Sequence, residues 1–265
     1  MIPVTGGGVV DIAVLDRMLA AEKRPALVSL MLANNETGVI QPVAEAARVA
    51  HAHGALLHCD AVQGAGKLPL DRARLGADLL TVSAHKLGGP TGVGALVVAP
   101  EVPLAATQTG GGQERGRRAG TENLPGIVGF GTACASAAER LGDYKAVAVL
   151  RDEAERRLLA IAPDAAVHGA GEGRLANTLC LSMPGVPAAT QVMALDLSGV
   201  MVSSGAACSS GKVKRSHVLD AMGLAPAIAE SAIRISLGWS TTAADIDRLV
   251  EAWGTLYTRN RASAA

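Results

Sequence analysis

A histidine and a lysine stand together where a predicted strand gives way to a glycine-rich loop. The sequence runs Ser83-Ala84-His85-Lys86 and continues into a stretch rich in glycine. A lysine held at a strand end loses hydration and proton affinity, so it can form a Schiff base with an aldehyde. Ligands of parallel sheets bind at the carboxyl ends of the strands. The motif therefore predicts a site for an aldehyde, although a solvated lysine after a strand explains it equally well.

An acidic residue and an amide follow the preceding predicted strand. Asp60 could pair with a protonated pyridine nitrogen and stabilise an electron sink, and Gln63 could hydrogen-bond the phenolic oxygen of the same ring. A metal site made of His58, Cys59 and Asp60 is the weaker interpretation, because neighbouring strand residues point to opposite faces. Together with Lys86, these side chains favour an organic cofactor with an aldehyde and a pyridine ring.

Three further loops contain residues that could do chemistry. Asn34 to Gly38 (NNETG) follows a strand directly, although a polar turn also explains this composition. The segment 110–123 combines glycines with arginines before a helix, which suits an anion. The segment 203–211 places Cys208 among small residues, where a thiol has the exposure and freedom that a nucleophile needs.

The composition favours a protein that acts on a small molecule. The chain has 265 residues, with 24 Lys and Arg against 24 Asp and Glu. A neutral charge argues against nucleic-acid and membrane-surface binding, since both need a basic face. Four widely spaced cysteines without a Cys-x-x-Cys pair argue against a disulfide framework and against structural zinc. With no signal peptide and no long apolar run, we expect a cytoplasmic protein.

The cysteines differ in their sequence surroundings. Cys134 and Cys180 lie in apolar, periodic segments, so we expect both in the core. Cys59 could be either buried or functional, and its strand position favours burial. His51 and His53 are expected to interact with a helix C-terminus rather than with a metal.

Alternating helices and strands must position these residues. In the first half, the pattern predicts helices over 11–21 and 42–54 and strands over 26–33, 55–59, 78–83 and 94–99. This alternation predicts an α/β fold with a parallel sheet. In the second half, it predicts helices over 144–161, 188–197, 215–222 and 243–257 and strands over 178–182, 200–203 and 232–237. That mixture indicates a smaller α+β domain, divided from the first near Gly142.

Taken in order, these motifs resemble those of a cysteine desulfurase of the pyridoxal-phosphate-dependent class V aminotransferase family, in the branch with a long cysteine loop. The resemblance covers about residues 8–249 and rests on NNETG, HCDAVQ, SAHK, RGRRAGTEN, SSGAACSSG and AIRISLG. It implies the type I fold of pyridoxal-phosphate enzymes, with 1–142 as the remainder of the large cofactor-binding domain. Residues 143–265 would form the small C-terminal domain that carries the cysteine loop. Family members carry upstream a glycine–threonine phosphate-binding turn and a ring-stacking histidine. This chain contains neither, so an incomplete large domain is expected.

The resemblance implies a role for individual residues. Lys86 matches the lysine that binds pyridoxal 5′-phosphate covalently, Cys208 matches the catalytic nucleophile, and Arg234 matches the arginine that pairs with the substrate carboxylate. A bidentate contact with a carboxylate is the physical reason for an arginine. Asp60 matches the residue that pairs with the pyridine nitrogen, and Gln63 and Asn35 match residues near O3′ of the cofactor or near the substrate. Ser83 and His85 match ligands of the cofactor phosphate. Thr121 matches a threonine that reaches the phosphate bound in the neighbouring subunit.

The implied activity is removal of sulfur from L-cysteine. The products would be L-alanine and a persulfide on Cys208, which would supply an acceptor such as an iron–sulfur scaffold. The role of Thr121 implies a homodimer with shared sites. The alternatives are a selenocysteine lyase, another class V enzyme, or an N-terminally truncated inactive homologue that retains a dimer or partner surface. A metal or redox binding protein is the weakest alternative, given the spacing of the potential ligands.

Overall fold

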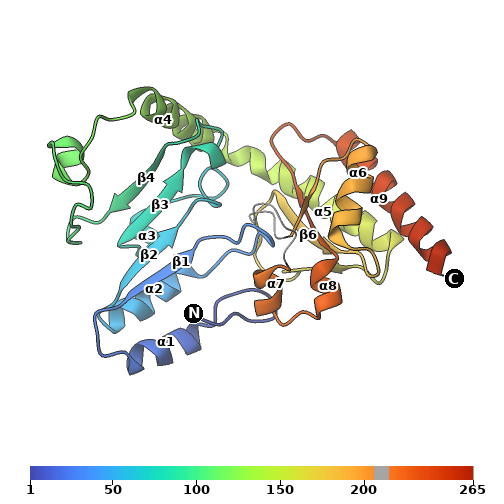
Figure 1. Cartoon of the computed structure of the whole chain (residues 1–265), viewed down its shortest axis with the longest axis horizontal. Helices are drawn as coiled ribbons and strands as arrows, with labels where there is room; N and C mark the ends of the chain where they lie inside the picture. The colour runs from blue at the N-terminus through green and yellow to red at the C-terminus, as the bar shows by residue number, and fades with distance from the viewer. Residues whose placement is uncertain (206–214, 265) are drawn as a thin grey trace. The chain divides into compact units, whose positions relative to one another are not determined.

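The strands that the computed structural model describes form two four-stranded sheets, one in each of two compact units (Figure 1). The structure describes residues 1–205 and 215–264. One unit consists of Leu15–Leu32 and Pro42–Leu141, and the other of Met1–Val14, Ala33–Gln41 and Gly142–Ala265. A single cut at residue 142 would place the two short N-terminal segments in the other unit. The assignment of 1–142 and 143–265 to the family's two domains stays a prediction.

The first sheet is mainly parallel, as predicted. Its strands lie in the order β1 (Leu27–Met31), β2 (Leu56–Asp60), β3 (Leu79–Ser83) and β4 (Gly94–Val98). β1, β2 and β3 run parallel, whereas β4 runs antiparallel to β3. The expectation that the strand over 94–99 also runs parallel was therefore wrong. The connection over 84–93 is shorter than the dozen or so residues that a parallel crossover needs, so the chain turns back beside β3.

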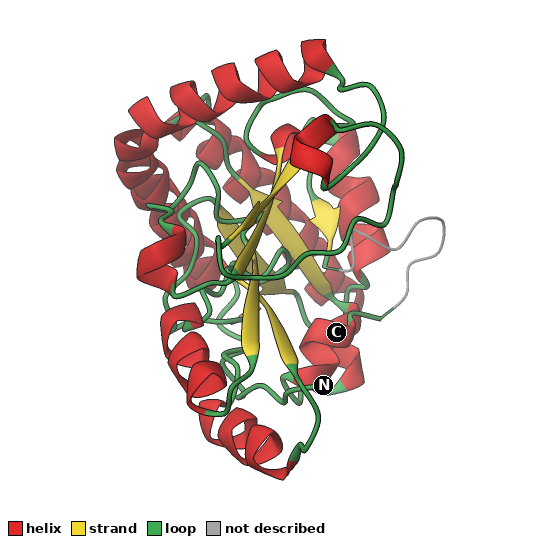
Figure 2. Cartoon of the chain, turned by 90° about the vertical axis from the view of Figure 1, so that its left-hand side faces the viewer, coloured by secondary structure: helices red, strands yellow, loops and turns green. Residues whose placement is uncertain are grey.

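Polar cap residues or a proline precede the helices of the first half of the chain. α1 (Ile12–Ala21) begins in the segment Met1–Val14 and follows Asp11, whose Oδ1 accepts a hydrogen bond from the Val14 amide at 2.9 Å. α2 (Val43–Ala52) follows a proline and packs against β1 and β2 (Figure 1). α3 (Arg72–Leu75) and α4 (Leu124–Glu139) are capped by Asp71 and Asn123. Figure 2, coloured by secondary structure, shows the helices flanking the strands.

The second sheet is antiparallel. Its strands lie in the order β5 (Ala166–Val167), β6 (Thr178–Ser182), β8 (Ala232–Ser236) and β7 (Ser203–Ser204). The helices of this unit are α5 (Tyr144–Ile161), α6 (Ala188–Leu197), α7 (His217–Ala221), α8 (Pro226–Glu230) and α9 (Ala243–Ala264). The core lies among β6, β8, α5 and α9, where Leu158, Leu181, Ile233 and Trp253 are fully buried. Apolar burial of this kind is the main source of stability.

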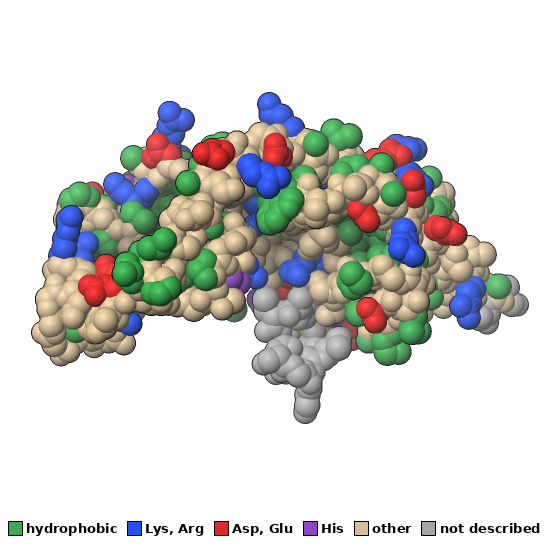
Figure 3. All heavy atoms as spheres, turned by 90° about the horizontal axis from the view of Figure 1, so that it is seen from above, with side chains coloured by type: hydrophobic (Ala, Val, Ile, Leu, Met, Phe, Trp, Pro, Cys, Tyr) green, Lys and Arg blue, Asp and Glu red, His purple; other side chains and the backbone are tan. Residues whose placement is uncertain are grey.

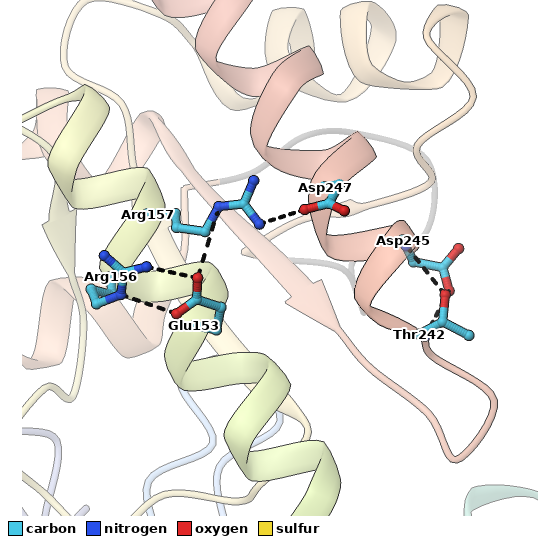
Figure 4. A network of polar contacts seen from close by, with 6 residues as sticks. All are labelled: Glu153, Arg156, Arg157, Thr242, Asp245 and Asp247. Atoms are coloured by element: carbon cyan, nitrogen blue, oxygen red, sulfur yellow. Dashed lines mark hydrogen bonds and ion pairs between the residues drawn. The ribbon is translucent and has the colours of Figure 1, made fainter.

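An ion pair of a small charged network joins α5 to α9 on the surface of this unit (Figure 4). Glu153 binds both Arg156 and Arg157, and Arg157 donates to the Asp247 carboxylate at 2.6 Å. At the start of α9, Asp245 accepts hydrogen bonds from the Thr242 amide and hydroxyl, both at 2.8 Å. Pairs this exposed contribute about 1 kcal/mol or less each. The contact between α5 and α9 therefore depends on the apolar core beneath them.

Hydrophobic side chains also reach the surface of the chain. Figure 3 shows them on one face of the molecule among charged side chains of both signs. The large exposed ones include Leu124 and Val128 of α4 and Met193 and Leu197 of α6. Among the described residues, no helix combines the length and the apolar character that crossing a membrane requires.

Two of the three described cysteines lie where the sequence predicted. Cys59 and Cys180 are fully buried. Cys134, in contrast, is exposed, so the prediction that it lies in the core was wrong. α4 also exposes Leu124 and Val128, so this helix carries apolar residues on its solvent-exposed face as well as on its buried face. An apolar segment of this kind does not reveal which of its sides is covered.

His168 is a buried histidine with a defined protonation state. Its Nε2 lies 2.6 Å from the Ser182 hydroxyl oxygen, and that hydroxyl donates its proton to the Ile228 carbonyl oxygen at 2.8 Å. Because the Ser182 proton is already used, the hydrogen on His168 Nε2 must donate to Ser182. Burial lowers the pKa of His168 to about 4.

This histidine makes the stability of the unit depend on pH. A lowered pKa stabilises the folded state above the ordinary histidine pKa of about 6.5, and the stabilisation is lost as pH falls toward 4. We expect the free energy of unfolding to lose about 2–3 kcal/mol from this group between pH 7 and pH 4.5. Urea unfolding at both pH values measures the loss. His168→Gln should remove that share of the pH dependence, whereas His85→Gln, at an exposed site, should keep it. An unchanged pH dependence in His168→Gln would contradict the assignment.

Candidate functional site

Several predicted site residues meet at one edge of the first sheet. Asp60 is the last residue of β2 and lies beside Thr81 of the parallel strand β3. Ser83 is the last residue of β3, and one turn of 3₁₀ helix (Ala84–Lys86) follows it directly. The carboxylate, the hydroxyl and the amine therefore follow adjacent parallel strands at their carboxyl ends, where ligands of such sheets bind.

The contacts of these residues leave functional atoms available. The Ser83 oxygen lies 2.8 Å from His85 Nδ1, which holds the two predicted phosphate ligands together. Asp60 Oδ1 accepts a hydrogen bond from the Val62 amide at 3.0 Å. Lys86 is exposed, and with the residues that the structure describes it makes neither a hydrogen bond nor an ion pair. A free amine and an oriented carboxylate thus stand at the carboxyl ends of two adjacent parallel strands.

A second lysine lies near Lys86. Lys67 is half-buried, and its ammonium donates to the Gln63 carbonyl oxygen at 2.8 Å. Burial, and secondarily the charge of Lys86, lower the pKa of Lys67 to about 8. The bond to the Gln63 carbonyl ties Lys67 to the turn after β2, whereas the Gln63 side chain is the part expected near the cofactor ring. Thr121 is exposed and lies shortly before α4, and its predicted reach to a neighbouring subunit stays a prediction.

The histidines of this unit bind protein groups. His58 bridges three strands, because its Nδ1 lies 2.8 Å from Ser29 Oγ and its Nε2 lies 3.2 Å from Thr81 Oγ1. His51 and His53 lie 2.9 Å and 2.7 Å from the carboxylates of Asp78 and Asp16 respectively. Within 1–205 and 215–264, no group of three His, Cys, Asp or Glu side chains could hold a metal ion. The metal interpretation of His58, Cys59 and Asp60 therefore finds no support in the described chain.

The residues at this sheet edge fit pyridoxal 5′-phosphate by their chemistry. The unpaired amine of Lys86 suits the aldehyde, and the carboxylate of Asp60 suits a protonated ring nitrogen. The Ser83 hydroxyl and the imidazole of His85 are hydrogen-bonding groups that suit a phosphate. Each of these groups has a counterpart on the cofactor.

A rigid turn in the other unit carries the NNETG motif. The side-chain oxygen of Asn34 accepts hydrogen bonds from the amides of Glu36 at 2.8 Å and Thr37 at 2.9 Å. Gly38 closes the turn with its amide on the Asn34 carbonyl and with a φ of +76°. A side chain there would be strained and would also meet Thr178 Cβ at 2.8 Å, so glycine is required. The polar turn predicted as the alternative is real, and it orders the motif.

Arg234 is held by this turn across a long sequence separation. It lies on β8, and its Nη1 donates to the Asn35 carbonyl oxygen at 2.8 Å. Its Nε is buried and has no hydrogen-bond partner among the residues that the structure describes. A buried donor without a partner costs about 1–3 kcal/mol, which a bound carboxylate would recover. Two of the predicted substrate residues, Asn35 and Arg234, are therefore brought together within one unit.

Cys208 belongs to residues 206–214, which lie outside the described residues. Its predicted role as nucleophile therefore stays a prediction. On the near side of that segment, the amide of Gly205 donates to the Ala232 carbonyl at 3.0 Å. On the far side, Ser216 caps α7 by accepting a hydrogen bond from the Leu219 amide at 3.1 Å.

Comparison with known protein families identifies the family of this chain. Residues 1–249 match the family described as Aminotransferase class-V. The chain belongs to this family. Pyridoxal 5′-phosphate is the cofactor of the class V, NifS-like fold, in agreement with the groups at the sheet edge.

Curated relatives of this class V chain carry the name cysteine desulfurase. A cysteine desulfurase of Cereibacter sphaeroides is 50% identical over 250 residues, which cover 94% of this chain and 64% of the relative. A cysteine desulfurase of Klebsiella pneumoniae is 42% identical over 261 residues, which cover 98% of this chain and 65% of the relative. The chain thus spans about 64% of the length of the curated relatives that it matches first.

Solved structures share the fold of the class V chain. The NifS-like protein from Rickettsia africae ESF-5 superposes with a TM-score of 0.88 at 36% identity, covering 97% of this chain and 69% of that one. DndA from Streptomyces lividans superposes with a TM-score of 0.70 at 35% identity, covering 89% of this chain and 66% of that one. These matches confirm the predicted fold class.

The structure adds two residues that the sequence did not single out. Glu36 is only 3% exposed, and its Oε2 accepts a hydrogen bond of 2.5 Å from the Ser216 hydroxyl. A glutamate in a polar turn and a serine before a helix are both ordinary surface residues in a sequence. Only their contact, across 180 positions, reveals a buried carboxylate near Arg234.

Proposed function

We propose that this class V chain acts as a cysteine desulfurase, which converts L-cysteine to L-alanine and transfers the sulfur to an enzyme cysteine. The observation that carries the proposal is that a free Lys86 amine and the Asp60 carboxylate stand at the carboxyl ends of adjacent parallel strands. The buried, partnerless Nε of Arg234 supports an amino-acid substrate. The 50% identity to a relative named cysteine desulfurase supports the choice of substrate.

The sheet edge would supply the proton chemistry. Bound pyridoxal 5′-phosphate provides an aldehyde for amines and a ring that accepts electrons. Lys86 would hold the cofactor covalently, and its amine would take the proton from the substrate Cα. Asp60 would keep the proton on the ring nitrogen, because an adjacent carboxylate stabilises that positive charge. Ser83 and His85 would bind the phosphate, and Gln63 would hydrogen-bond the ring oxygen.

The other unit would supply substrate binding, and Cys208 the sulfur chemistry. Arg234 would bind the substrate carboxylate, with Asn35 beside it. The Cys208 thiolate would attack the sulfur of the substrate, so that a new S–S bond forms while the substrate Cβ–S bond breaks. The electron pair of that bond would stay with the carbon fragment, which would take up one proton at Cβ, regain the Cα proton from Lys86 and leave as L-alanine.

Further partners are part of the same proposal. The persulfide sulfur would pass to an acceptor protein such as an iron–sulfur scaffold. Thr121 would reach the phosphate of a neighbouring subunit, so the functional form would be a homodimer. A cytoplasmic location remains the prediction drawn from composition and cysteine usage.

The proposal predicts that the chain, mixed with pyridoxal 5′-phosphate and a reducing thiol, forms sulfide and L-alanine from L-cysteine. Because one bond is cleaved per turnover, the two products should appear in equal amounts. Methylene-blue detection of sulfide and chromatography of alanine measure them. A higher kcat/KM with L-selenocysteine would identify a selenocysteine lyase instead. A folded chain that binds the cofactor but forms neither product would be an inactive homologue.

A further inference from the structure

Glu36 is a buried carboxylate that the proposed reaction does not use. It is 3% exposed and lies in the same turn as Asn35, whose carbonyl oxygen holds Arg234. A buried carboxylate is costly unless hydrogen bonds or a counter-charge compensate it. The nearest strong contact of Glu36 is the Ser216 hydroxyl, at 2.5 Å from its Oε2.

Arg234 lies near this carboxylate, because its Nη1 binds the carbonyl oxygen of Asn35, the residue that directly precedes Glu36. Burial raises the pKa of Glu36, and the Ser216 hydrogen bond and the charges of His217 and Arg234 oppose that rise. Glu36 in turn raises the pKa of the buried Cys180 thiol, which pairs with Arg234 in the sheet register. Glu36, His217, Arg234 and Cys180 therefore form one electrostatic group within a single unit.

Glu36 and Arg234 nevertheless form no ion pair in the part of the chain that the structure describes. The carboxylate is bound to Ser216, and the buried Nε of Arg234 is left without a partner. A direct arginine–carboxylate pair would satisfy both groups and is stronger than a single bond to a hydroxyl. The observed arrangement leaves the Nε of Arg234 without a partner instead of forming that pair.

We propose that Ser216 holds the Glu36 carboxylate away from Arg234 and so keeps the guanidinium available for the carboxylate of an amino-acid substrate. The inference rests on the proposed role of Arg234. Ser216 and Glu36 act as positioning residues, since they work through Arg234. Without the Ser216 hydroxyl, Glu36 turns toward Arg234 and competes with the substrate. The apparent dissociation constant rises in inverse proportion to the fraction of molecules in which the pair stays open.

A double-mutant cycle on the full chain tests this competition. The probe is L-alanine, the product of the proposed reaction, titrated without cofactor. Binding is followed on the Nε–H nuclear magnetic resonance signal of Arg234 in the ¹⁵N-arginine-labelled chain, and Arg234→Lys assigns that signal. Ser216→Ala should weaken binding about tenfold. This is the effect expected if molecules with a Glu36–Arg234 ion pair outnumber molecules without it by about ten to one. Adding Glu36→Gln to Ser216→Ala should restore affinity, because the competing charge is gone.

The cycle separates competition from structural damage. Ser216→Ala also removes the cap of α7, and the double variant keeps that loss, so restored affinity cannot come from the helix. Ser216→Thr, which retains a hydroxyl, should bind like the parent chain. An unchanged affinity in Ser216→Ala would overturn the inference, and so would a double variant as weak as Ser216→Ala.

The same titration tells this inference apart from the proposed function. If L-alanine does not shift the Arg234 signal in the parent chain, Arg234 is not the carboxylate ligand, and both proposals fail at this residue. If Arg234→Lys abolishes binding while the Ser216 and Glu36 variants bind normally, the role of Arg234 stands and only the positioning role fails.

Discussion

Lys86→Ala is expected to abolish covalent binding of pyridoxal 5′-phosphate and to lower sulfide production by at least about 10³-fold. The loss should be large because one amine both attaches the cofactor and moves the Cα proton, and proton transfer alone is worth about 10²–10⁴-fold. Lys86 suits this role because it is exposed, unpaired among the described residues and placed at the end of β3. Borohydride reduction followed by peptide mass spectrometry locates the attached cofactor.

Lys67 provides the matched control for this experiment. Its pKa of about 8 favours deprotonation, but its nitrogen is bound to the Gln63 carbonyl oxygen. Lys67→Met should therefore retain covalent attachment at Lys86. Reduced cofactor found on Lys67 in the parent chain, or still attached in Lys86→Ala, would show that the cofactor lysine has been misassigned.

Cys208→Ala is expected to eliminate sulfide and persulfide formation while leaving cofactor binding intact. Cysteine thiolates, not thiols, are the nucleophiles, and burial suppresses the thiolate. Burial raises the pKa of both Cys59 and Cys180 to about 12, so neither of them supplies a nucleophile near neutral pH. The variant should keep the visible cofactor absorbance, because Lys86 and Asp60 lie at the sheet edge of the other unit.

Cys134→Ala is the control for this variant, since Cys134 is the exposed cysteine among the described residues. Burial still raises the pKa of its thiol, so we expect the variant to keep full activity. A maleimide gel-shift assay of persulfide, run with and without L-cysteine, compares the two variants. Persulfide that persists in Cys208→Ala and disappears in Cys134→Ala would assign the sulfur carrier to Cys134.

Local sequence patterns predicted most of the elements of both units. α5 (Tyr144–Ile161), β6 (Thr178–Ser182) and α6 (Ala188–Leu197) have the predicted bounds, because each is an apolar periodic segment between polar or proline breaks. The end of β3 was also predicted, and β2 ends one residue later than predicted, so the position of Asp60 and Lys86 at the carboxyl ends of adjacent strands was expected. The direction of β4 was not, since strand pairing depends on the length of the connection as well as on the strand itself.

The sequence by itself determined which residue types stand at the strand ends, and these types predicted both the cofactor and the family. Only the tertiary structure decided which groups are buried and which are left unpaired. It buries Glu36 against Ser216, leaves the Nε of Arg234 without a described partner and exposes Cys134. Helix and strand periodicity acts over a few residues, whereas these contacts join positions up to 199 residues apart and depend on how the elements pack.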